Sequence, residues 1–216
     1  MSRKRRGSYD DSKAWQLFDA EAAYADSIFQ MALGDTERSV AAAERALALR
    51  PLYPPAVLTM GSIEYQRRRE NEGRRLFLSL LSLPDDDCDI REIIDTAGSF
   101  LIRSKKYADG LDLFRGAVER FTDRANLYQG LGCCAGHEGL FDEAVAAYEK
   151  ALALEPNRQD LTNDLGWSLY ESGRLERARE VLRRAVSMDA SDELGRENLR
   201  ICEQALSKKR ASEEKV

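Results

Sequence analysis

Residues 125–157 read ANLYQGLGCCAGHEGLFDEAVAAYEKALALEPN and hold two short amphipathic segments on either side of a turn. Tyr128, Leu131, Gly132 and Ala135 fall at i, i+3, i+4 and i+7, which is the spacing of one face of an α-helix. After a turn at Gly139 the same period continues in Ala144, Tyr148 and Ala151. The stretch therefore predicts two helices joined as a hairpin.

Small residues allow the two predicted helices to pack closely. Gly132 has no Cβ and Ala144 has only a methyl group, so a bulky side chain such as Tyr148 fits between the backbones. Pro156 ends the second helix, because proline disfavours helical geometry in the preceding residue and donates no backbone hydrogen bond. Two helices bury only one face, so the hairpin requires neighbours.

The same alternation of small and large residues recurs along the chain with a period of about 34 residues, after a short insertion near Asp87. The position of Gly132 is taken by Ser27, Gly61, Gly98 and Gly166. The position of Ala144 is taken by Ser39, Gly73, Gly110 and Ala178, and that of Tyr148 by Ala43, Phe77, Phe114 and Leu182.

This pattern resembles the tetratricopeptide repeat family over roughly Ala20 to Asp192. The resemblance implies an all-α fold, a right-handed α-solenoid of about five helix-turn-helix repeats with a C-terminal capping helix. The expected solenoid covers 11–207, with repeats at 20–53, 54–87, 91–124, 125–158 and 159–192 and a capping helix at 193–206. In that helix Leu194, Ile201 and Ala205 are expected to face inward. Glu64 departs from the pattern, because a small or apolar residue is usual there.

Both ends of the chain are predicted to be disordered, at 1–10 and at 208–216. The basic run Arg3 to Arg6 is either a solvated tail or a contact for nucleic acid or an anionic surface. A long first helix is expected from Asp11 or Ser12 to about Leu33. Its extra turns, with Trp15, Leu17 and Phe18, either cap the solenoid or form an interface with a second molecule.

Composition narrows the possible functions. Lys and Arg total 33 against 38 Asp and Glu, a formal charge of −5, so nucleic acid is not an expected partner. No apolar run is long enough to span a membrane, and no apolar segment follows the basic N-terminus, so a cytoplasmic location is expected. Cys88, Cys133, Cys134 and Cys202 contain no CxxC pair and are expected to be reduced.

No catalytic constellation emerges, and neither a cofactor nor a metal site is expected. Cys133 and His137 share a helical face, but a zinc site needs further ligands and a nucleophilic pair needs an orienting group. Asp85, Asp86, Asp87 and Asp89 lack the glycine and glutamate that complete a calcium loop, and Asp89 is the expected cap of the following helix. The protein is therefore not expected to be an enzyme.

The family resemblance implies a concave groove lined by the first helix of each repeat. The candidate residues for that groove occupy the second, fifth, ninth, twelfth and thirteenth places of a repeat. They are Tyr24, Ile28, Met31, Leu58, Ser62, Tyr65, Gln66, Glu92, Asp95, Ser99, Ile102, Arg103, Asn126, Gln129, Cys133, His137, Asp160, Asn163, Trp167, Tyr170 and Glu171. Asn163, Trp167 and Tyr170 form the best local anchor, because aromatic side chains contribute most at interfaces.

The groove residues predict the kind of partner. The lysine, asparagine and arginine set with which some family members grip a terminal carboxylate is missing, since the matching positions hold Asp95, Ser99, Gln129 and Cys133. We therefore expect a non-catalytic scaffold or adaptor that binds a protein or peptide segment with apolar anchors and some basic character. The alternatives are a self-assembling homo-oligomer, through Trp15 and Phe18 or through the Arg67–Arg75 region, and a small chaperone-like assembly or secretion factor.

Overall fold

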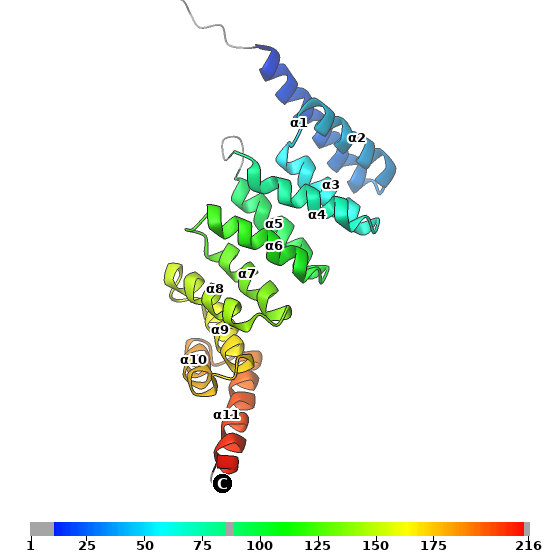
Figure 1. Ribbon diagram of the computed structural model, residues 1–216. Coiled ribbons are helices and arrows are strands. Elements are labelled where there is room, and N and C mark those ends of the chain that lie inside the picture. The colour runs from blue at the N-terminus through cyan, green and yellow to red at the C-terminus, as the bar shows by residue number, and fades with distance from the viewer. Residues whose placement is uncertain (1–10, 85–88, 214–216) are drawn as a thin grey trace, which may run out of the picture. The chain divides into compact units, whose positions relative to one another are not determined.

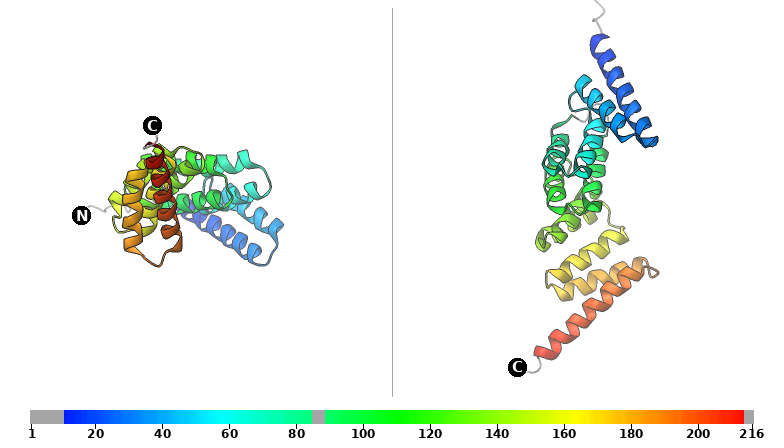
Figure 2. Two further views of the ribbon diagram at one scale, coloured as in Figure 1. Left: turned by 90° about the horizontal axis from the view of Figure 1, so that it is seen from below. Right: turned by 90° about the vertical axis from the view of Figure 1, so that its right-hand side faces the viewer.

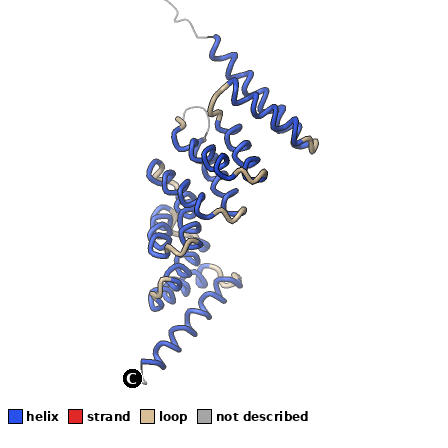
Figure 3. Tube along the Cα trace, turned by 45° about the vertical axis from the view of Figure 1, so that its right-hand side comes forward, coloured by secondary structure: helices blue, strands red, loops and turns tan. Residues whose placement is uncertain are grey.

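The computed structural model describes residues 11–84 and 89–213, and within these ranges it contains helices, turns and loops but no strand (Figure 1, Figure 3). The helices are α1 (Asp11–Ala32), α2 (Thr36–Leu49), α3 (Pro54–Gln66), α4 (Glu70–Ser79), the short 3₁₀ helix η1 (Leu80–Ser82), α5 (Ile90–Arg103), α6 (Tyr107–Arg120), α7 (Ala125–His137), α8 (Phe141–Leu154), α9 (Gln159–Glu171), α10 (Leu175–Met188) and α11 (Glu193–Glu213). The predicted all-α class is confirmed. None of the described helices combines the length and apolar character needed to cross a membrane.

The chain divides into two compact units, residues 1–97 and 98–216. The first unit contains the hairpins α1–α2 and α3–α4 and the beginning of α5. The second contains the end of α5, then α6, the hairpins α7–α8 and α9–α10, and α11, which packs on α10 and α9 (Figure 2). Each unit is thus a succession of helix hairpins.

The predicted pairing of small and large residues is what joins the hairpins. A Cβ at Gly132 would lie 2.8 Å from the ring of Tyr148, so only glycine lets that ring lie against the α7 backbone. The same relation holds between Gly61 and Phe77, between Gly98 and Phe114, and between Gly166 and Leu182. The first hairpin has two hydroxyl groups instead, and the Oγ atoms of Ser27 and Ser39 lie 3.2 Å apart within hydrogen-bond distance.

Phe114 also connects one hairpin to the next. Its side chain is fully buried, and a Cβ at either Gly98 or Gly130 would clash with its ring. Gly98 belongs to α5 and Gly130 to α7, so the ring of this α6 residue lies between two bare stretches of backbone. Close packing of α6 against α7 therefore depends on Gly130.

The turn inside each hairpin uses a left-handed backbone conformation. Gly34, Gly139 and Gly173 have φ values of 80°, 75° and 76°. At the same place in the other two hairpins Arg68 and Lys105 have φ values of 62° and 56°. This conformation costs an ordinary L-residue free energy that glycine does not lose, so two of the turns carry local strain.

The unusual Glu64 is buried in the first unit, with 3% of its surface exposed. Nη2 of Arg69 donates a hydrogen bond to Oε1 of Glu64 at 2.6 Å, and Nε of Arg69 lies 2.5 Å from Oε2. Nη1 of Arg67 lies 3.9 Å from Oε1. Part of the basic run after α3 therefore neutralises a buried carboxylate of the same hairpin.

The last helix differs from its prediction. It continues to Glu213 instead of ending at 206, so most of the segment 208–216 is helical, and 214–216 lie outside the described residues. The extension is polar, and Nζ of Lys209 lies 3.9 Å from Oε1 of Glu176 on α10. The prediction that Leu194 faces inward is wrong, because 62% of its surface is exposed. Ile201 and Ala205 are half-buried, and the buried stripe consists of Gly195, Asn198, Cys202 and Leu206.

Other expectations concern the loop before α5 and the N-terminal segment. Oδ1 of Asp89 accepts a hydrogen bond from the backbone N–H of Arg91 at 3.2 Å, which confirms Asp89 as a helix cap. Residues 1–10, Asp85 to Cys88, and the side chains of Trp15 and Leu17 lie outside the described residues. The expectations that rest on them stay predictions.

Candidate functional site

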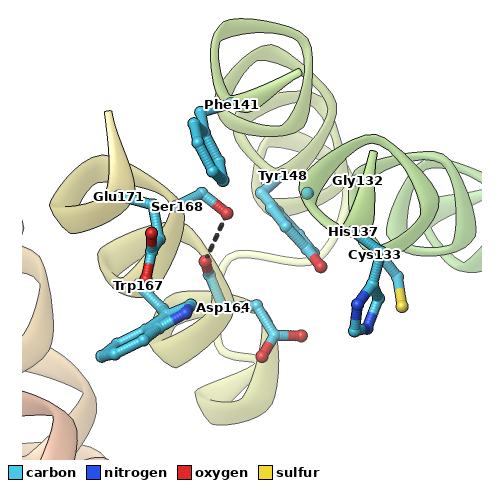
Figure 4. Close-up of a pocket in the computed structure, with 10 residues that line it drawn as sticks. Gly132, Cys133, His137, Phe141, Tyr148, Asp164, Trp167, Ser168 and Glu171 are labelled. Atoms are coloured by element: carbon cyan, nitrogen blue, oxygen red, sulfur yellow. Dashed lines mark hydrogen bonds between the residues drawn. The ribbon is translucent and has the colours of Figure 1, made fainter. Parts of the chain in front are cut away.

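A partly open cavity of about 400 Å³ lies in the second unit, where α7, α8 and α9 meet (Figure 4). Its volume falls within the range of small-ligand sites in proteins. The lining residues come from all three helices and are Gly132, Cys133, Gly136, His137, Phe141, Tyr148, Asp164, Trp167, Ser168 and Glu171.

The spacing of residues on α7 and α9 creates this cavity. Gly132 and Gly136 are one helical turn apart on α7, and a Cβ at Gly136 would meet only the methyl group of Ala144, at 4.0 Å. On α9 four residues at i, i+3, i+4 and i+7 face the space that these glycines leave. They are Asp164, Trp167, Ser168 and Glu171.

The polar side chains of α9 that line the cavity differ in their hydrogen-bond and salt-bridge partners. Ser168 donates a hydrogen bond from Oγ to the backbone carbonyl of Asp164 at 2.9 Å, drawn as a dashed line in Figure 4. The carboxylate of Asp164 points into the cavity that Trp167 and His137 also line (Figure 4). Asp164 forms no salt bridge within residues 11–84 and 89–213. Among the described residues, this carboxylate therefore faces the cavity without a salt-bridge partner.

The electrostatic environment of Asp164 disfavours its charged form. Burial raises the pKa of Asp164 to about 6, and the negative charge of Asp160 adds to this effect. The amide of Gln129 and the positive charge of Arg158 oppose it, but do not cancel it. An ionised Asp164 at neutral pH is consequently incompletely compensated.

The guanidinium group of Arg158, directly before α9, is hydrogen-bonded to residues other than Asp164. It donates from Nε to Oδ1 of Asp160 and from Nη1 to Oε2 of Glu155, both at 2.8 Å. It also donates to Oε1 of Gln129 at 3.0 Å and to Oδ1 of Asn126 at 3.3 Å. Three predicted groove residues, Asn126, Gln129 and Asp160, are thus gathered around one guanidinium group.

Aromatic rings stack on both sides of the cavity. The rings of Trp167 and Tyr170 on α9 stack with centroids 4.9 Å apart and planes inclined by 29°. The ring of His137 stacks on Tyr107 of α6 at 3.9 Å and 11°. Trp167 and Tyr170 are half-buried, so each has surface left for a ligand.

Two predicted groove residues are buried and unavailable to a partner. Tyr65 is 7% exposed, because the space left by Gly73 lets its ring pack inside its own hairpin, 5.6 Å from the ring of Phe77. Asn163 is also buried, and its Oδ1 accepts a hydrogen bond from Nδ2 of Asn198 on α11 at 3.1 Å. Asn163 therefore helps to attach α11 to α9 and is not part of the anchor that the sequence predicts.

The remaining predicted residues lie apart from this cavity. In the first unit Ile28 and Met31 are exposed, and the hydroxyl group of Tyr24 lies 3.5 Å from that of Thr59. Leu58, Asp95, Ser99 and Ile102 are half-buried, and Arg103 is exposed. Burial and the charge of Glu92 raise the pKa of Asp95. Of the predicted groove residues, four line the cavity, namely Cys133, His137, Trp167 and Glu171.

Asp164, whose pKa is raised furthest among the described carboxylates, was not identified from the sequence. Asp164 occupies the sixth place of its repeat, where the preceding repeat has Gly130, and groove residues are not expected at that place. One feature of the sequence could have identified Asp164. It is a charged residue at the repeat position where the preceding repeat has a glycine that packs against Phe114. Phe141, Tyr148 and Ser168 were likewise absent from the predicted set.

The cavity provides little for nucleophilic chemistry. Burial, assisted by the charge of Asp164, raises the pKa of the Cys133 thiol, and burial raises that of Cys134 to about 12. The ring of His137 stacks on Tyr107. Within the described part of the chain, no three His, Cys, Asp or Glu side chains gather in a group that could hold a metal ion.

Comparison with known proteins agrees with the fold. A sequence profile described as tetratricopeptide repeat matches residues 137–197. Two curated relatives are similar over longer stretches. The small glutamine-rich tetratricopeptide repeat-containing protein 2 of Mycosarcoma maydis is 23% identical over 59% of the chain, and the human tetratricopeptide repeat protein 16 is 26% identical over 77%. The chain spans 36% and 20% of the lengths of these relatives.

Solved structures share the fold at low sequence identity. YrrB, described as a TPR protein with an unusual peptide-binding site, superimposes with a TM-score of 0.60 at 20% identity, covering 82% of this chain and 90% of that one. MamA from Desulfovibrio magneticus gives 0.58 at 17%, over 81% and 97%. The first TPR domain of Spaghetti, bound to an HSP90 peptide, gives 0.52 at 17%, over 54% and 93%. The repeat period, the hairpins and these matches together support a tetratricopeptide repeat protein.

Proposed function

We propose that the chain is a non-catalytic interaction scaffold that binds a peptide or an extended protein segment across α7 and α9, at the cavity between them. The observation that carries this proposal is the cavity itself, which combines Trp167, stacked on Tyr170, with the carboxylate of Asp164, for which the described residues provide no salt bridge. Half-buried aromatic side chains next to a concave space are typical anchor points of interfaces.

Proteins of the same fold support peptide binding as the function. YrrB is described as having a peptide-binding site, and the Spaghetti domain was solved with the HSP90 peptide SRMEEVD. The present cavity does not suit an acidic peptide of that kind, because its lining includes Asp164 and Glu171 and neither lysine nor arginine. The scaffold therefore binds a different class of segment.

The test is selection from a library of random peptides by the full chain, followed by affinity measurement on individual selected peptides. Trp167→Ala is expected to weaken binding at least about tenfold, since aromatic anchors contribute 2 kcal/mol or more at interfaces. Phe29→Ala removes an exposed aromatic side chain of α1, outside the cavity, and serves as the matched control with unchanged affinity. Equal affinity of the wild type and Trp167→Ala would show that the cavity is not the binding site.

A second function, self-association, is favoured by the exposed apolar stripe on α1. Phe18 and Phe29 of α1 and Leu33, the residue directly after it, are 62%, 59% and 65% exposed and are spaced at the helical period along one side. The mass of the protein in solution is then expected to rise with concentration, and less so in a Phe29→Ser, Leu33→Ser variant. A monomer mass that stays constant over the concentration range, measured by sedimentation equilibrium, would exclude this function.

A further inference from the structure

The geometry of the cavity points to the chemistry of its ligand: it selects an arginine side chain of the bound peptide, whose guanidinium group pairs with Asp164 and lies against Trp167. This inference rests on the proposed function and names the residue that the site recognises. It is carried by the position of the carboxylate, the aromatic surface beside it and the sign of the surrounding charges.

The first argument is the missing counter-charge. Oxygen atoms of Glu64, the buried carboxylate of the first unit, lie 2.5–2.6 Å from Arg69 nitrogens. Asp164 has no such partner in the described part of the chain, and the nearby Arg158 already bonds Asp160 and Glu155. A carboxylate taken partly out of water retains a strong preference for a cation that can enter the cavity.

The charged groups around Asp164 favour a cation over any other ligand. On α9 Asp160 and Glu171 are acidic, and Arg158 before the helix is engaged by Asp160 and by Glu155. The ionisable side chains that line the cavity are Cys133 and His137 on α7 and the buried Tyr148 on α8. The pKa of Tyr148 is raised by burial and by the charges of Asp164 and Asp160, so its hydroxyl group stays neutral. The potential in the cavity is therefore negative at neutral pH.

The aromatic surface favours arginine over lysine. The planar guanidinium group can stack on an indole ring and donate two parallel hydrogen bonds to one carboxylate, whereas an ammonium group does neither. Asp164 and Trp167 lie at i and i+3 on α9 and line the same cavity (Figure 4). We infer that one guanidinium group contacts both. Lysine is expected to bind in the same place with lower affinity.

Peptides selected from the random library supply the test. Each selected peptide is resynthesised with its arginine replaced by citrulline, which has nearly the same shape but no charge. Wild-type protein is expected to bind the arginine form at least about tenfold more tightly, because charge-assisted hydrogen bonds are roughly twice as strong as neutral ones. Asp164→Asn is expected to lose this preference while still binding the citrulline form.

Asp160→Asn is the matched control. It removes an acidic group from the same helix, one turn earlier, but one that Arg158 already neutralises, so the preference for arginine is expected to persist. Selected peptides without an enriched arginine, or a preference that survives in Asp164→Asn, would overturn the inference and leave peptide binding intact. A library from which nothing is selected would overturn the proposed function itself. Comparing arginine with citrulline on wild-type protein needs no variant, so misfolding of a variant cannot hide the result.

Discussion

Glu64 in the first unit and Asp164 in the second are both carboxylates that are partly or fully removed from water, but they differ in their burial and in their charged partners. Glu64 is almost fully buried and held by Arg69 from the turn of its own hairpin. Asp164 is half-buried beside a cavity, and burial raises its pKa to about 6. The first arrangement stabilises a hairpin, whereas the second leaves a carboxylate that we propose is neutralised by a bound ligand.

The largest effect is expected from removing the partner of Glu64. Arg69→Ala leaves a buried carboxylate with only the distant Arg67, and such a loss costs about 3 kcal/mol of unfolding free energy. The control is Arg75→Ala, which breaks the exposed pair with Glu72 and costs at most about 1 kcal/mol. Urea unfolding of both variants measures the difference. If Arg69→Ala costs no more than Arg75→Ala, Glu64 is not a buried charge that depends on its partner.

A smaller effect of opposite sign, a gain in stability, is expected when Asp164 is replaced. Its folded-state pKa is raised above the ordinary carboxyl value, so the folded protein binds the proton more tightly than the unfolded chain. The free-energy cost of an ionised Asp164 in the folded protein is therefore absent at low pH and is fully present once the pH has risen above about 6. Asp164→Asn is expected to raise stability by about 1–2 kcal/mol at pH 8 and to change it little near pH 4.

Unfolding of the wild type and Asp164→Asn by urea at both pH values tests this expectation. His137 lines the same cavity and is ionisable, so the pair is also compared in a His137→Gln background. A destabilised Asp164→Asn at pH 8 would mean that Asp164 contributes to the fold as Glu64 does, and the contrast between the two units would disappear.

The smallest effect concerns the turns that precede the second helix of each hairpin. Arg68 adopts the left-handed conformation beside the Glu64–Arg69 pair, where α7–α8 has Gly139. Arg68→Gly removes the strain but adds entropy to the unfolded chain, so a net gain of about 0.5 kcal/mol is expected. Gly139→Ala is expected to lose about 1 kcal/mol. Thermal unfolding of the two variants measures both changes, and equal signs would contradict this account of the turns.

The fold was predictable from sequence because it depends on residue size at a fixed period. Gly132 opposite Tyr148, and the equivalent pairs in three further hairpins, could be identified without coordinates, since a bulky side chain next to a helix backbone requires glycine. The extension of α11 to Glu213 was not predictable, because its last turns are polar and depend on contacts such as Lys209 with Glu176.

The site was less predictable than the fold, because exposure depends on neighbours that no period specifies. Tyr65 occupies a groove position, yet Gly73 opens a space in which its ring is buried. Asn163 occupies another, yet it pairs with Asn198 of the last helix. Asp164 lies at a place where the family pattern expects no groove residue. Its role depends on a missing counter-charge, which only the three-dimensional arrangement shows.

The most direct test of the assignment of Asp164 is to measure how many protons are released when a peptide binds in the cavity. Calorimetric titration at pH 6, in two buffers of different ionisation enthalpy, measures the protons released as the full chain binds a selected arginine peptide. Asp164 is about half protonated at that pH, so pairing with a guanidinium group is expected to release about half a proton per peptide. The Asp164→Asn variant is expected to release almost none. Binding of the arginine peptide by wild-type protein with no proton release, or with the same release from Asp164→Asn, would contradict the assignment of Asp164 as the group that the ligand neutralises.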